Sequence, residues 1–128
     1  MKRPVLIDSS AWVEAGRPGG DPAITARLEG LIQVGLTAMT EPVWLELHQG
    51  ARGKREEEQL ARWRALSVWL SFDNACWQQA AKSARTCLRS GVNVPFADVL
   101  VDACARRYGV ELLERDRHFA MIAHAIKG

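Results

Sequence analysis

Two aspartates follow short apolar segments, at positions where their side chains could bind a ligand. Asp8 comes directly after Val5–Ile7, and Asp116 lies just beyond Leu112–Leu113. Such segments are typical of buried strands in a parallel sheet, and ligands of these sheets bind beyond the carboxyl ends of the strands. We therefore expect both carboxylates at the same edge of a sheet. Each aspartate also precedes an expected helix, so helix capping is an alternative function that is compatible with ligand binding.

Glu46 is a charged residue within an otherwise apolar helical segment. It stands between Leu45 and Leu47, in a helix that is expected to begin at Thr40. Charged side chains are rarely buried unless they are paired or bind a metal ion, so Glu46 is a candidate ligand. The alternative is an ordinary exposed glutamate. The neighbouring Glu41 lies in the first turn, where the helix dipole favours a negative charge. Stabilisation of the helix start is therefore a better explanation for Glu41 than metal binding.

Asp98 and Asp102 are four residues apart in a segment of apolar and small residues, so both carboxylates lie on one face of the expected helix. No lysine or arginine is three or four residues from Asp98. Like charges at this spacing repel each other, and a bound cation is the simplest compensation. For Asp102 the alternatives are support of another ligand or a hydrogen bond to nearby backbone.

A cluster of these carboxylates would favour one kind of metal site. Oxygen ligands suit Mg²⁺ or Mn²⁺ better than zinc, which prefers histidine and cysteine. Carboxylates packed together raise one another's pKa unless a divalent cation compensates their charge. Such an ion activates a water molecule and stabilises the charge that develops on a phosphate under attack.

The elements that position these acids alternate between strands and helices. Strands are expected at 5–7, 36–39 and 110–113, and helices at 9–14, 21–34, 40–50, 75–90, 96–108 and 117–126, with a long amphipathic segment at 52–70. Ser9 or Ser10 is the expected N-cap of the first helix, Asp21 that of the second, and Gly109 the C-cap after 96–108. Alternating strands and helices indicate an α/β fold with a central parallel sheet flanked by helices.

Length and composition favour one globular domain over residues 1–128. No apolar run approaches the roughly 20 residues that a membrane span requires, and the first residues are not typical of a signal peptide. The 3 cysteines form no CxxC pair and are interpreted as buried, reduced thiols. These features predict a cytoplasmic protein without a membrane contact.

The net charge of +2 is too small to indicate nucleic-acid binding by itself, but the distribution of the charges is more informative about the substrate. If five of the 15 acids face a metal ion, 10 acids remain against 17 lysines and arginines. A basic surface around an acidic pocket suits a polyanionic substrate. Arg115 and Arg117 are candidates for holding a flanking phosphate, although exposed surface arginines without a function are the alternative. The three histidines are scattered and are not predicted ligands; His118 lies nearest to a predicted one, Asp116.

Four blocks of this sequence, in this order and at these separations, resemble the PIN-domain ribonucleases, and more narrowly the VapC toxins of VapBC toxin–antitoxin pairs. The blocks are Val5–Ser10, Thr40–Leu47 leading to Gly50, Pro95–Ala105 and Leu112–Phe119. Each block alone is modest, but the ordered set is fairly specific and spans the chain. The resemblance implies a central parallel sheet with flanking helices, and cleavage of RNA that depends on Mg²⁺ or Mn²⁺.

The resemblance also assigns functions to individual residues. It implies an acidic quartet of Asp8, Glu46, Asp98 and Asp116. The first three of these would hold one ion, with Asp116 completing the site or supporting a second ion. Ser10 matches a small polar position that is expected to bind the Asp8 carboxylate or a metal-bound water. Asp102 falls where many relatives have a small residue, so it is a fifth acid or a supporting group.

Partners are implied by the resemblance alone. Members of the family usually form homodimers, and an antitoxin inhibits them by placing its C-terminal segment in the active-site groove. Three other classes of protein are alternatives for this sequence. A phosphoacceptor signalling domain would need a lysine where 114–117 has none, and a non-catalytic PIN-like binding module would not need the complete acidic set. A structure-specific DNA nuclease usually needs a longer chain.

Overall fold

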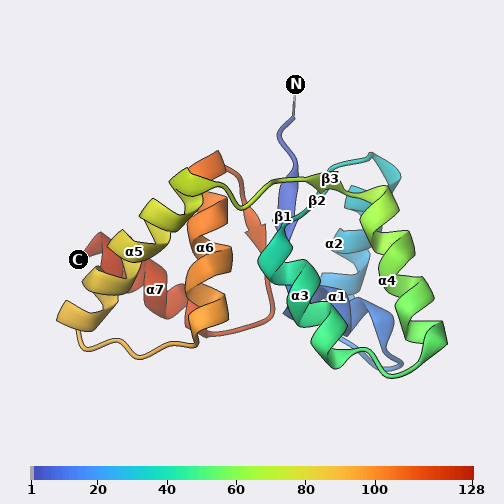
Figure 1. Cartoon of the computed structure of the whole chain (residues 1–128). Helices are drawn as coiled ribbons and strands as arrows, with labels where there is room; N and C mark the ends of the chain where they lie inside the picture. Colours follow the sequence, from blue (N-terminus) through green and yellow to red (C-terminus); the bar gives the residue numbers. More distant parts are fainter. Residues whose placement is uncertain (1) are drawn as a thin grey trace.

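The computed structural model, which describes residues 2–128, has a parallel four-stranded sheet at its centre (Figure 1). The strands lie in the order β3-β2-β1-β4, with bounds β1 Val5–Ile7, β2 Thr37–Met39, β3 Val68–Trp69 and β4 Leu112–Leu113. Leu6 of β1 pairs with Ala38 of β2 on one side and with Leu112 of β4 on the other. The predicted α/β fold with a central parallel sheet is confirmed.

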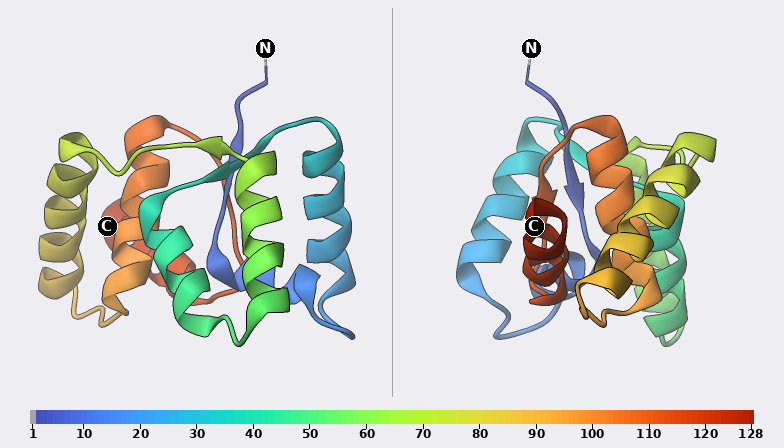
Figure 2. Two further views of the ribbon diagram at one scale, coloured as in Figure 1. Left: turned by 45° about the vertical axis from the view of Figure 1, so that its right-hand side comes forward. Right: turned by 90° about the vertical axis from the view of Figure 1, so that its left-hand side faces the viewer.

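Helices connect the strands, as parallel pairing requires. Within residues 2–128 they are α1 Ser9–Gly16, α2 Pro22–Gln33, α3 Glu41–Gly50, α4 Lys54–Leu66, α5 Asn74–Arg89, α6 Phe96–Tyr108 and α7 His118–Lys127. In Figure 1, α1, α2 and α4 lie on one side of β1, α5 to α7 lie on the other, and α3 lies below β1 between the two groups. The views in Figure 2 show that helices cover both faces of the sheet. None of the helices in this range is long and apolar enough to cross a membrane.

The core lies between the sheet and the helices. All residues of β1 and β2 are buried, and Val43 of α3, Val101 of α6 and Ile122 of α7 pack in the same cluster. The three cysteines are buried and form no disulfide within the described chain, in agreement with the sequence. The continuous apolar strands are therefore covered on both faces, as expected for a parallel sheet.

Helix ends follow the sequence closely, with one exception. Asp21 caps α2 by accepting hydrogen bonds from the backbone N–H groups of Ala23 and Ile24. Gly109 ends α6 with a φ of 64°, a left-handed conformation that glycine adopts without a steric penalty. The expected N-cap at Ser9 or Ser10 is wrong, because Asp8 occupies that position and its carboxylate accepts a hydrogen bond from the Ser10 backbone.

The segment 52–70 contains a fourth strand that the periodicity did not predict. Helix α4 ends at Leu66, and Val68–Trp69 forms β3 beside β2. Leu66 and Leu70 are four residues apart, so the helical spacing of apolar residues continues across the break. In the structure the Ser67 hydroxyl donates to the Trp63 carbonyl over 2.8 Å, and the Leu70 N–H donates to the Met39 carbonyl over 2.8 Å. Pairing with β2, a tertiary interaction, therefore makes Val68–Trp69 a strand and not a continuation of α4.

Candidate active site

Asp8 lies at the carboxyl end of β1, as the sequence predicted, and only 2% of its surface is exposed. Its Oδ2 accepts hydrogen bonds from the Ser10 hydroxyl over 2.6 Å and from the Ser10 N–H over 3.1 Å. Its Oδ1 is buried without a hydrogen-bond partner among the described residues. Burial raises the pKa of Asp8, and the nearby charge of Asp116 raises it further. Ser10 thus holds one carboxylate oxygen and leaves the other free for a ligand.

Glu46 approaches Asp8 from α3, where its side chain is half-buried. Its Oε1 accepts a hydrogen bond from the Ser9 hydroxyl over 3.1 Å, which ties α3 to the start of α1. Burial raises the pKa of Glu46, and the charges of Asp8 and Asp116 also contribute. Glu46 is therefore not an ordinary solvated glutamate.

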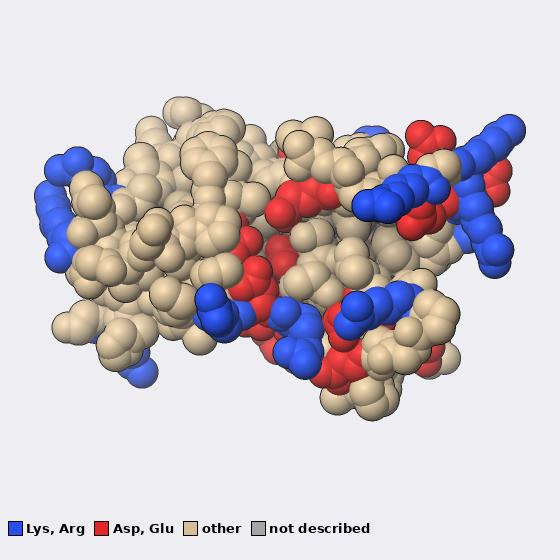
Figure 3. All heavy atoms as spheres, turned by 90° about the horizontal axis from the view of Figure 1, so that it is seen from below, with Lys and Arg blue, Asp and Glu red and all other residues tan. Residues whose placement is uncertain are grey.

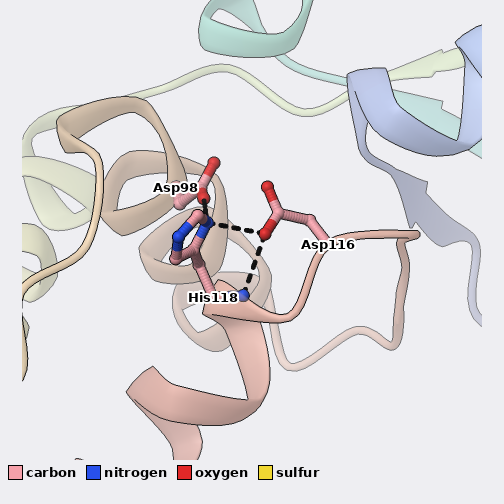
Figure 4. A group of neighbouring side chains, drawn as sticks. All are labelled: Asp98, Asp116 and His118. Carbon is pink, nitrogen blue, oxygen red and sulfur yellow. Dashed lines mark hydrogen bonds and ion pairs between the residues drawn. The ribbon is translucent and has the colours of Figure 1, made fainter.

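Asp98 and Asp116 meet at His118 (Figure 4). Asp98 lies in the first turn of α6 and is 5% exposed, while Asp116 precedes α7. The His118 Nδ1 is 3.1 Å from the Asp98 Oδ2 and 2.7 Å from the Asp116 Oδ1. Burial, followed by the charge of Asp116, raises the pKa of Asp98 to about 7. These two acids form the more crowded part of the site.

The four acids of the predicted quartet lie near enough to influence one another's charge, but among the described residues only Asp98 and Asp116 of the four belong, with His118, to a group whose ligand atoms all lie within 4.8 Å of one another. Asp8 affects the pKa of both Glu46 and Asp98, and Asp116 affects that of the other three. Figure 3, viewed toward the carboxyl ends of the strands, shows acidic side chains gathered in a hollow between the two halves of the molecule. Basic side chains lie beside this hollow, so its surroundings suit a polyanion.

Asp102 does not join this group. It is buried, and it accepts a hydrogen bond over 2.6 Å from the Arg106 Nε, one helical turn further along α6. Its pKa is raised by burial and lowered by Arg106, and the other site acids do not influence it. The interpretation of Asp102 as a fifth metal ligand is therefore wrong. Arg106, four residues further along the sequence, could have indicated this pairing.

Glu114 is an acid of this site that the sequence analysis missed. It directly follows β4, is half-buried, and accepts a hydrogen bond from the Asp116 N–H over 3.3 Å. Burial raises its pKa, and the charges of Asp8 and Asp116 add to this. Its place at the end of a strand was the available signal, because the same rule pointed to Asp8.

The two candidate phosphate-binding arginines are exposed next to the acids. The Arg115 side chain contacts Asp21 with its Nε 3.0 Å from the Asp21 Oδ2, and its backbone N–H donates to the Ser10 hydroxyl over 2.9 Å. Arg117 stands at the N-cap position of α7. The Ser10 hydroxyl thus links the β4–α7 connection to Asp8 by accepting one hydrogen bond and donating another.

The donor set fits a hard divalent cation. Four carboxylates converge from separate elements, and buried oxygens of Asp8 and Asp98 have no hydrogen-bond partner within residues 2–128. Buried anionic oxygens without partners are costly unless a cation or a proton neutralises them. Oxygen ligands at several carboxylates suit Mg²⁺ or Mn²⁺, which are known to activate water for attack on phosphate esters.

Comparisons with known proteins agree with this fold. The PIN domain family model matches residues 5–125. The VapC ribonuclease Mb1587 from Mycobacterium bovis is 34% identical over 122 residues, covering 93% of this chain and 91% of the relative. The chain therefore belongs to the PIN domain family, and within it to the VapC ribonucleases.

Solved structures share the fold at lower sequence identity. FitAcB from Neisseria gonorrhoeae has a TM-score of 0.75 at 20% identity, and the match covers 94% of this chain and 93% of that one. VapBC2 from Rickettsia felis, bound to a DNA fragment from their promoter, has a TM-score of 0.72 at 17% identity, with 84% of each chain covered. At these identities the likeness concerns the arrangement of strands and helices.

Proposed function

We propose that this protein is an endoribonuclease dependent on Mg²⁺ or Mn²⁺, and the toxin of a type II toxin–antitoxin pair. One observation carries the proposal: Asp8, Glu46, Asp98 and Asp116 converge from separate elements at one edge of the sheet, and two of them have unpartnered buried oxygens. The VapC ribonuclease relatives support RNA as the substrate.

In the proposed mechanism, Asp8, Glu46 and Asp98 would hold the divalent ion, and Asp116 would complete the site. When bound, the ion supplies activation of a water molecule for attack at phosphorus and stabilises the developing charge. Ser10 and Ser9 fix the carboxylates of Asp8 and Glu46 through hydrogen bonds of 2.6 and 3.1 Å.

Arg115 and Arg117 hold phosphates that flank the scissile bond. The exposed pair of Arg115 with Asp21 contributes little stability, since surface ion pairs are worth about 0–1 kcal/mol. A substrate phosphate can therefore replace Asp21 as the partner of the guanidinium group.

The proposed partner is an antitoxin that covers the site. A groove of about 320 Å³ between α1, α3 and α4 has Ser9 and Glu46 in its lining, together with the apolar side chains of Val13, Leu60 and Trp63. The groove thus continues from the acids onto an apolar surface, which suits a segment that occupies both. The solved VapBC2 structure supports a toxin–antitoxin partnership by likeness of fold.

A homodimer is the proposed assembly. Exposed apolar side chains gather on α5 and α6, namely Trp77, Leu88 and Phe96. Apolar patches of this kind often mark protein interfaces.

We place the protein in the cytoplasm, where its proposed RNA substrate occurs.

Incubation of the purified protein with bulk RNA tests the activity. We expect cleavage with Mg²⁺ or Mn²⁺, no cleavage with a chelator, and a loss of about 100-fold or more in Asp8→Asn and Asp98→Asn. Glu58→Gln is the control, because Glu58 is exposed on α4 away from the site acids. Cleavage that survives both aspartate substitutions, or continues in chelator, contradicts the proposed mechanism.

A further inference from the structure

His118, the histidine nearest in sequence to the predicted ligand Asp116, lies against two of the site acids. Its Nδ1 is 2.7 Å from the Asp116 Oδ1 and 3.1 Å from the Asp98 Oδ2 (Figure 4). All three side chains place a ligand atom within 4.8 Å of the others. Asp98 is 5% exposed, and its Oδ2 has no hydrogen-bond partner in the described part of the chain. A buried, unpartnered oxygen is thus directed toward the imidazole.

Both contacts are close enough to be ion pairs when the imidazole is protonated, but the Nδ1 makes no hydrogen bond among residues 2–128. In an octahedral metal site with bonds of about 2.1 Å, adjacent ligand atoms lie about 3 Å apart. The two nitrogen–oxygen separations agree with this spacing. Since all three ligand atoms also lie within 4.8 Å of one another, one ion can contact all of them.

The local backbone keeps this arrangement in place before any ion binds. The Asp116 Oδ1 accepts a hydrogen bond from the His118 N–H over 2.9 Å, so the two side chains are fixed relative to each other by a tight turn. Asp98 is held by its burial in α6. A preformed set of ligands reduces the conformational entropy that is lost on binding.

We propose that His118 supplies a nitrogen ligand, beside Asp98 and Asp116, to a divalent transition-metal ion such as Mn²⁺. This rests on the proposed metal dependence of the site and adds to it a choice of metal. Imidazole nitrogen binds transition metals well, whereas Mg²⁺ favours oxygen ligands and water. The site should therefore prefer Mn²⁺ to Mg²⁺ more strongly than a site of carboxylates alone.

Electron spin-echo envelope modulation of bound Mn²⁺ tests the nitrogen ligand directly. We expect modulation from a coordinated ¹⁴N nucleus that changes to the ¹⁵N pattern when only the histidines are labelled with ¹⁵N. His118→Gln should abolish the signal. His124→Gln, an exposed histidine on the same helix, is the matched control and should keep it. Wild-type protein with bound Mn²⁺ but no histidine modulation overturns the inference while leaving the proposed function intact.

Equilibrium binding of each metal gives a second readout. We expect His118→Gln to reduce the ratio of Mn²⁺ to Mg²⁺ affinity about tenfold, and His124→Gln to leave it unchanged. Equal or tighter binding of Mn²⁺ by His118→Gln would mean that the imidazole competes with the ion for the two carboxylates, which overturns the inference. Failure of wild-type protein to bind either metal would instead remove the proposed function on which the inference depends.

Discussion

The single residue Asp98 shows how burial favours metal binding. Burial raises the free energy of its ionised carboxylate, and a bound cation would lower it. Its folded-state pKa is raised from 3.8 to about 7, first by burial and then by the charge of Asp116. Because the folded pKa lies above the unfolded one, the protonated form favours the folded protein. This contribution is complete below about pH 3.8 and is lost as the pH rises through about 7.

Asp98→Asn should therefore stabilise the metal-free protein at pH 8 by about 1–2 kcal/mol, which corresponds to roughly 5 °C in Tm, and the effect should become smaller at pH 5 and vanish below about pH 3.8. Thermal unfolding in the presence of a chelator measures this. The control is Asp73→Asn, which should lower the Tm at pH 8 because its hydrogen bonds with Arg107 lower the pKa of Asp73. A lower Tm of Asp98→Asn at pH 8 contradicts the argument.

Ser10 is the residue that connects two parts of the site. Its hydroxyl donates to Asp8 and accepts from the Arg115 N–H. We expect Ser10→Ala to weaken metal binding about tenfold, since groups that orient a ligand typically contribute 10–100-fold, while the far-ultraviolet circular dichroism spectrum is retained. Isothermal titration calorimetry with Mn²⁺ measures this, with the exposed Ser90→Ala as control. Unchanged affinity would show that Asp8 needs no orienting group.

At the scale of the elements, three of the four acids stand at or near helix N-termini. Asp8 is the N-cap of α1, Asp98 lies in the first turn of α6, and Asp116 precedes α7. The positive end of a helix dipole stabilises a carboxylate by typically 0.3–1 kcal/mol. The helices thus partly offset the repulsion among the acids, and Glu46, within α3, is the exception.

The end of α6 sets the connection from the helix that carries Asp98 to β4. Gly109 has a φ of 64° there, and a residue with a Cβ is strained in this conformation. Gly109→Ala should therefore reduce the free energy of unfolding by about 1–2 kcal/mol, measured by denaturant titration. Gly30→Ala is the control. Gly30 is helical, and nothing lies within 4 Å of an added Cβ, so this change should stabilise the protein by up to about 1 kcal/mol. Equal effects of the two changes would contradict the argument.

For the whole molecule, the acidic site makes stability depend on metal and pH together. Four carboxyl groups have raised pKa values, namely Asp8, Glu46, Asp98 and Glu114. They therefore keep their protons to a higher pH than free carboxyl groups do, and a protonated carboxyl group does not bind a metal ion. The metal-free protein should lose stability as the pH rises and these carboxyl groups lose their protons, and a divalent ion should restore that stability.

Saturating Mn²⁺ or Mg²⁺ should consequently raise the Tm more at pH 8 than at pH 5.5. At 100 times Kd the stabilisation is about 2.7 kcal/mol. Differential scanning calorimetry measures it, with a chelator to show reversal and Asp8→Asn to show that the effect comes from the site. A metal effect of the same size at both pH values would contradict the linkage between protonation and binding.

Local patterns in the sequence were enough to predict most of the helices and strands and most of the site. Apolar runs marked β1 and the region of β4, and Asp21 and Gly109 marked helix ends, because these signals involve only neighbouring residues. The rule for strand ends indicated Asp8 and Asp116. The convergence of these acids with Glu46 and Asp98 was expected from the sheet and from the family resemblance together.

Tertiary contacts decided the rest. Strand β3 forms because it pairs with β2, although its segment continues a helical spacing. From its spacing along the chain, Asp102 was a better candidate for the metal site than Glu114 or His118. In the structure Asp102 pairs with Arg106, whereas Glu114 lies near the site acids and His118 lies against two of them. Sequence periodicity tells which face of an element a side chain occupies, but the distance between atoms on different elements is set only when those elements pack.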